Sequence, residues 1–177
     1  MTRRHKIFVS YHHNLDQGYR NQFERMCGDR IVSRSVDIGD IDQNNSTDNV
    51  RRIIREQYLR DSTVTVVLIG KQTWQRKHVD WEISASLRAT LISPRSGILG
   101  ILLPSYPRPA PGKYSSSTVP PRLYDNVECK FACIYPWSTD PNEIQGWIHE
   151  AFQRKDSINP HNSRTLFGKN RSGGHWE

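Results

Sequence analysis

The sequence contains little cysteine and no long hydrophobic run. None of its three cysteines, Cys27, Cys129 and Cys133, stands in a CxxC or other zinc-ligand spacing, so we expect reduced core residues and no metal site built on them. No apolar run approaches the roughly 20 residues that span a bilayer, and the N-terminus lacks the hydrophobic region of a signal peptide. These absences predict a cytoplasmic protein with no membrane partner.

Several enzyme motifs are also missing. The chain has no GxGxxG dinucleotide fingerprint, no GxxxxGK[ST] phosphate loop and no G-x-S-x-G nucleophile elbow. Asp37, Asp40 and Asp42 lack the remaining ligands of a calcium loop and suit turn chemistry. A response regulator needs an aspartate at the end of the third predicted strand, where this chain has Ile69 and Gly70. The absence of these motifs therefore argues against a Rossmann dinucleotide-binding protein, a P-loop protein, a serine hydrolase with a nucleophile elbow, a calcium-loop protein and a response regulator.

Composition indicates one small folded domain. The 177 residues are 35% hydrophobic and 10% aromatic, and we assign residues 1–155 to the domain and 156–177 to a polar, loosely held tail with an anchor at Leu166 and Phe167. The net charge of +7 suits an anionic partner. Much of that charge is dispersed, however, and we expect Arg51, Arg52 and Arg55 to face solvent. The sequence therefore does not favour nucleic acid as a ligand.

Strand and helix patterns alternate along the chain. Five segments rich in β-branched and apolar residues predict strands, namely Lys6–Tyr11, Ile31–Val36, Thr63–Ile69, Gly97–Leu103 and Lys130–Tyr135. Apolar spacings of three and four residues predict helices over 16–27, 47–58, 78–91 and 141–152, the last starting at the Asp140-Pro141 cap. The proline-rich residues 104–122 predict a loop without a regular helix. We therefore predict an α/β, flavodoxin-like three-layer fold with a five-stranded, mostly parallel sheet in the order 2-1-3-4-5.

The predicted topology locates a binding site. Ligands of such sheets bind outside the carboxyl ends of the strands, at the switch point between the first and third strands. This rule selects the segments Ser10–Asn14 and Gly70–Trp74. Hydrogen-bonding and aromatic side chains in the two segments are Tyr11, His12, His13, Lys71, Gln72 and Trp74.

Glu82 lies close to this point, one turn into the third predicted helix. Helical geometry puts it at the edge of the stripe formed by Val79 and Ile83, so it is either a carboxylate at the pocket or a surface glutamate that complements the helix dipole. Trp81 is expected to point outward. The adjacent His12 and His13 suit ordinary loop histidines better than metal ligands, because no carboxylate or cysteine stands at metal spacing.

Three blocks in this order resemble the TIR-like family of the Thoeris antiphage defence system, the ThsB family. They are Ile7-Phe8-Val9-Ser10-Tyr11-His12, the segment Ser62–Gly70, and the most specific block, Lys71–Ile83. The resemblance implies a TIR-like fold and makes Glu82 the catalytic glutamate. It further implies Ser10, Tyr11, His12, Lys71 and Trp74 as substrate-binding residues.

The resemblance also implies an activity. Such an enzyme cleaves the nicotinamide–ribose bond of NAD, its substrate, without another cofactor or a metal, and makes an ADP-ribose-derived signalling nucleotide. The nucleotide diffuses to a separate effector protein, and the enzyme answers a phage-derived trigger. The alternative is a TIR-like module that does no catalysis and works by protein–protein interaction, including self-association.

Overall fold

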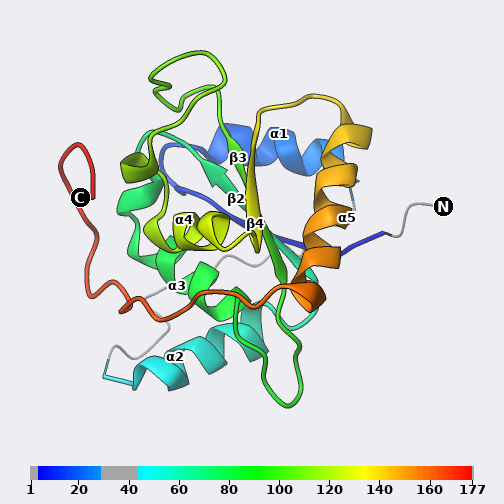
Figure 1. Cartoon of the computed structure of the whole chain (residues 1–177), viewed down its shortest axis with the longest axis vertical. Helices are drawn as coiled ribbons and strands as arrows, with labels where there is room; N and C mark the ends of the chain where they lie inside the picture. Colours follow the sequence, from blue (N-terminus) through cyan, green and yellow to red (C-terminus); the bar gives the residue numbers. More distant parts are fainter. Residues whose placement is uncertain (1–3, 29–43, 177) are drawn as a thin grey trace.

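A parallel sheet forms the centre of the molecule (Figure 1). The computed structural model describes residues 4–28 and 44–176. The four strands lie in the order β1-β2-β3-β4, and all three pairings are parallel. Their bounds are Ile7–Ser10 for β1, Val64–Ile69 for β2, Gly97–Leu102 for β3 and Ala132–Pro136 for β4. Every residue of β1, β2 and β3 is buried, as expected for parallel strands covered on both faces.

The sheet confirms an α/β fold with parallel strands but not the predicted count and order. The structure describes four strands in sequence order, not five in the order 2-1-3-4-5. The segment Ile31–Val36, which we predicted as the second strand, lies outside the described residues. The strands predicted as first, third, fourth and fifth correspond to β1, β2, β3 and β4.

Helices cover both faces of the sheet (Figure 1). Helices α1 (Gln17–Cys27) and α5 (Pro141–Ser157) pack on one face, where their apolar residues join Val66 and Leu99 in a common core. The opposite face carries α2 (Thr47–Ile53), α3 (Lys77–Ser86) and α4 (Pro121–Glu128). The described residues also form three short helices of about one turn, namely η3 (Ile54–Tyr58), η4 (Thr73–Gln75) and η5 (Ser116–Thr118).

The start of α5 confirms the cap read from the sequence. The Asp140 carboxylate accepts a hydrogen bond from the Asn142 amide at 2.9 Å, and Pro141 occupies the first turn. Proline suits this position because the first amides of a helix have no partner within it. The same reasoning explains α4, which begins at Pro121 inside the segment 104–122. Our prediction that this segment holds no helix was therefore wrong at its end.

Two further predictions about helices were wrong. Helix α3 ends at Ser86 instead of continuing to Leu91, which is fully exposed. Arg55, predicted to face solvent, is completely buried in η3. Its guanidinium donates to Ser93 Oγ at 2.9 Å and Ser96 Oγ at 2.8 Å, and to two backbone carbonyls. Burial is tolerated because these acceptors replace the lost water.

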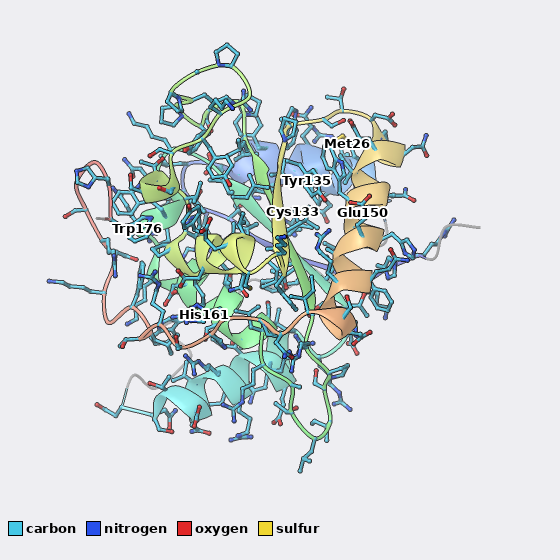
Figure 2. All side chains as sticks on the ribbon, in the orientation of Figure 1. Met26, Cys133, Tyr135, Glu150, His161 and Trp176 are labelled. Atoms are coloured by element: carbon cyan, nitrogen blue, oxygen red, sulfur yellow. The ribbon has the colours of Figure 1, made fainter. Side chains whose placement is uncertain are left out.

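The C-terminal segment 158–176 runs along α3 and α4 and is held there by hydrogen bonds (Figure 2 labels His161 and Trp176). The Trp176 indole donates to the Ser116 and Val119 carbonyls at 2.9 and 3.0 Å. Phe167 is buried, which confirms the predicted anchor. The expectation of a loosely held tail was wrong, because its polar residues bond to the helices below it. Within the described part of the chain, no helix combines the length and apolar character needed to cross a membrane.

Candidate active site around Glu82

Glu82 is completely buried, which rules out the interpretation of a surface glutamate. It lies on α3 and faces the carboxyl end of β1, where the Ser10 hydroxyl donates a hydrogen bond to its Oε2 atom. A buried carboxylate is tolerated only when it is paired or hydrogen-bonded. The fold therefore holds this carboxylate in place at the edge of the sheet where ligands of α/β proteins bind.

Two histidines lie next to this carboxylate. His13 follows β1, and His78 precedes Glu82 by one helical turn on α3. One side-chain atom from each of His13, His78 and Glu82 lies within 4.8 Å of the others. The two imidazole rings are 4.4 Å apart between centroids. His78 is buried, whereas His13 is partly exposed, so the cluster opens toward solvent on the His13 side.

The electrostatics of the cluster favour the neutral form of His78. Burial lowers the pKa of His78 to about 4, and the nearby charges of Arg76 and the neighbouring histidines act in the same direction. A hydrogen bond between His78 Nε2 and the Tyr11 carbonyl, at 2.9 Å, opposes the shift. Burial also lowers the pKa of His12, and the charge of Arg76 lowers it further. The Arg76 cation therefore lies close enough to His12 and His78 to act on both imidazoles.

Helix α3 is fixed from the side opposite the sheet. Arg122 and Asp80, both buried, form an ion pair with Nε–Oδ1 and Nη2–Oδ2 distances of 2.9 and 3.3 Å. Asp80 also accepts the Phe167 amide at 2.9 Å. Trp81, predicted to point outward, is buried and donates to the Phe167 carbonyl at 2.9 Å. All ten residues of α3 are buried, Glu82 among them.

The other predicted site residues occupy different environments. Tyr11 is buried, stands 4.7 Å from the His13 ring and donates its hydroxyl to Gln17 at 2.6 Å. His12 is buried, and its Nδ1 accepts the Leu15 amide. Lys71 is exposed in the loop after β2. Trp74 is buried and lines a cavity of about 480 Å³ together with residues of the C-terminal segment.

A family model for the TIR-like domain of the Thoeris protein ThsB matches residues 8–108. The chain belongs to the ThsB TIR-like family. The matched region runs from β1 through β3 and contains both Ser10 and Glu82, whereas α4, β4, α5 and the C-terminal segment lie beyond it. No curated protein matches the chain.

Sequence reasoning missed a further acidic residue at this edge of the ThsB-family domain. Asp16 is buried, and burial raises the pKa of its carboxyl. Its Oδ1 accepts a long hydrogen bond of 3.4 Å from Ser105, and among the described residues its Oδ2 has no partner. The carboxylate packs against Gly70, where an added Cβ would clash with it. Its place before α1 suggests a helix cap, but the side chain makes no capping bond.

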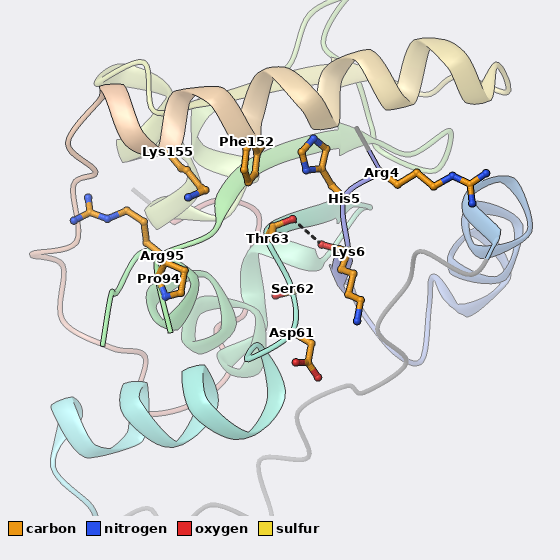
Figure 3. Close-up of a pocket in the computed structure, with 10 residues that line it drawn as sticks. All are labelled: Arg4, His5, Lys6, Asp61, Ser62, Thr63, Pro94, Arg95, Phe152 and Lys155. Carbon is orange, nitrogen blue, oxygen red and sulfur yellow. Dashed lines mark hydrogen bonds between the residues drawn. The ribbon is translucent and has the colours of Figure 1, made fainter. Parts of the chain in front are cut away.

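A second cavity of the ThsB-family domain lies at the opposite edge of the sheet (Figure 3). Its volume is about 340 Å³, and its lining includes Lys6, Thr63 and Arg95 with Phe152 on α5. Lys6 and Thr63 immediately precede β1 and β2, so this cavity marks the amino ends of the strands. Neither cavity is lined by Glu82. Ligands of parallel α/β sheets bind outside the carboxyl ends of the strands, which favours the Glu82 edge as the ligand-binding one.

Proposed function

We propose that this ThsB-family protein cleaves the nicotinamide–ribose bond of NAD and that Glu82 is its catalytic carboxylate. The product is an ADP-ribose-derived signalling nucleotide that acts on a separate effector protein in antiphage defence. The observation that supports this most directly is the buried Glu82 side chain, held by Ser10 at the carboxyl edge of the sheet.

A single carboxylate suits this chemistry. When the bond between the ribose C1′ and the nicotinamide nitrogen breaks, its electron pair stays with nicotinamide, which leaves as a neutral molecule and needs no general acid. The ribose acquires positive oxocarbenium character, which a nearby anion stabilises, as in glycosidases. An acceptor hydroxyl or amine then bonds to C1′ and loses a proton. Burial strengthens the effect of Glu82, because charges interact more strongly away from water.

Neighbouring residues suit other parts of NAD. Arg76 carries a cation beside the cluster, and among the described residues its buried Nε has no hydrogen-bond partner. It is suited to the pyrophosphate, whose oxygens accept charge-assisted hydrogen bonds. His13 is partly exposed beside Tyr11, and the two rings offer a surface on which a flat base can stack.

The test compares wild-type protein with Glu82→Gln. Nucleotides are extracted from phage-infected cells and analysed by mass spectrometry, because infection supplies the trigger that purified protein lacks. We expect the NAD-derived product to fall at least about 100-fold in Glu82→Gln, by analogy with the loss of one charge-stabilising group in other enzymes. Glutamine retains the size of the side chain and an oxygen for the Ser10 hydrogen bond, so folding should be preserved.

Glu128→Gln is the matched control, because Glu128 is exposed at the end of α4. We expect it to give wild-type amounts of product. Equal NAD-derived products in wild-type and Glu82→Gln cells would refute the catalytic proposal. Retained defence in those cells would instead favour the interaction module, for which the exposed Leu91 and Ile92 offer a contact surface.

A further inference from the structure

The cluster around Glu82 has the composition and spacing of a metal site. His78 and Glu82 stand four residues apart on α3, so their side chains share one face of the helix. His13 approaches from the loop after β1, and the three potential ligand atoms lie within 4.8 Å of one another. Bonds of about 2.0–2.1 Å to a tetrahedral ion need ligand atoms roughly 3.3 Å apart. Small rotations of side chains, one of them on a partly exposed loop, would reach that spacing.

The surrounding hydrogen bonds also match those of metal ligands. Ligating histidines usually bond through the second ring nitrogen to a carbonyl or carboxylate, and ligating carboxylates are themselves hydrogen-bonded. His78 Nε2 lies 2.9 Å from the Tyr11 carbonyl, which leaves Nδ1 as the unprotonated nitrogen. Glu82 accepts the Ser10 hydroxyl through Oε2. The end of β1 thus orients both residues that α3 supplies.

We propose that His13, His78 and Glu82 form a three-ligand site for a divalent transition-metal ion, with Zn²⁺ as the probe, and that metal binding withholds Glu82 from NAD. Two imidazoles and one carboxylate are a ligand set that Zn²⁺ accepts, with water or another ligand in the fourth position. The partly exposed His13 side provides entry for the ion.

Binding of the metal is independent of the proposed function, whereas its inhibitory effect rests on that function. A carboxylate bound to a dication has its negative charge neutralised, so it stabilises a developing ribose cation poorly. The ion also occupies the space beside Glu82. The metal therefore acts as a reversible inhibitor that competes with NAD.

The first experiment measures Zn²⁺ binding to the chelator-treated full chain by isothermal titration calorimetry. We expect one Zn²⁺ per chain, and His13→Ala and His78→Ala should each weaken binding at least about tenfold. His161→Ala is the matched control, because this side chain is 56% exposed on the C-terminal segment and should leave binding unchanged. If His78→Ala does not fold, the Zn²⁺ affinity of His13→Ala decides the test, because the partly exposed His13 can be changed with less effect on folding.

A charge variant provides a second readout. The Arg76 cation repels a metal ion, so Arg76→Gln should bind Zn²⁺ several-fold more tightly. Absence of a one-to-one complex, or wild-type affinity in His13→Ala, would overturn the metal site. A preparation that releases nicotinamide should be inhibited by Zn²⁺ and recover with chelator; binding without inhibition overturns the regulatory half alone. If infected cells give equal NAD-derived products for wild type and Glu82→Gln, the proposed function fails, and the calorimetry still decides the metal site.

Discussion

The buried ion pair between Asp80 and Arg122 gives a quantitative prediction about stability. Both side chains are almost completely buried, at 2% and 0% exposure. Asp80→Ala removes two hydrogen bonds to the guanidinium and one to the Phe167 amide. Among the residues that the structure describes, the Asn162 and Thr165 oxygens would remain as acceptors for the buried charge of Arg122.

The expected loss follows from the desolvation of the remaining charge. Breaking a buried pair from one side costs about 3–5 kcal/mol, and an amide left without its acceptor adds about 1 kcal/mol or more. We therefore expect Asp80→Ala to lower the free energy of unfolding by about 4–6 kcal/mol, which corresponds to roughly 8–24 °C in Tm. The measurement is urea unfolding followed by tryptophan fluorescence, supported by a thermal scan.

The control is Asp48→Ala, which breaks a pair with Arg88 in which the Asp48 side chain is 72% exposed. Exposed pairs contribute about 1 kcal/mol or less, so this change should be small. If Asp80→Ala does not fold, Asp80→Asn keeps an oxygen for the Phe167 amide and should still be destabilised by more than Asp48→Ala. Equal losses of unfolding free energy at positions 80 and 48 would refute the conclusion that the Asp80–Arg122 ion pair stabilises the packing of α3.

Two further predictions concern other positions. Gly97→Ala should destabilise the fold by at least about 1–3 kcal/mol, because its Cβ would clash with the Ala151 backbone of α5, whereas Gly146→Ala should stabilise α5 by about 0.5–1 kcal/mol in the same denaturant assay. A stable Gly97→Ala protein would contradict this packing. Since burial raises the pKa of Asp16, the fold favours its protonated form, and stability should fall as pH rises from about 4 through the raised value. Asp16→Asn should remove that pH dependence and raise Tm at neutral pH. If the pH profile of Tm is the same in the variant and in the wild type, Asp16 is not the group responsible.

The sequence predicted those elements whose signal is local. The β-branched run Val64–Ile69 became β2, and the Asp140-Pro141 pair began α5 as expected. Residues whose environment depends on distant parts of the chain were placed wrongly. Helical periodicity assumes one solvent-facing side, so it put Arg55 and Trp81 outside although both are buried.

The candidate site was half predictable for the same reason. The switch-point rule brought Ser10 and Glu82 to one edge of the sheet, and the structure joins them by a hydrogen bond. The complete burial of Glu82 was not predictable, because helical periodicity relates a side chain only to the apolar stripe of its own helix and does not show what packs against it. Nor was the cluster of His13 with His78, since neither shows a metal spacing to the other along the chain. Only the four-residue interval between His78 and Glu82 was a usable local signal.

The covering of α3 by the C-terminal segment has a consequence for biosynthesis. The Lys77 amide bonds to Asn170, which lies 93 residues later, and the Trp81 indole bonds to Phe167, which lies 86 residues later. At about 5–20 residues per second, a ribosome delivers these partners roughly 5–20 s after the helix itself. The contacts that complete the helix with Glu82 therefore form late in folding. A nascent chain that stalls before residue 160 carries the Glu82 carboxylate on a helix that lacks its contacts with the C-terminal segment.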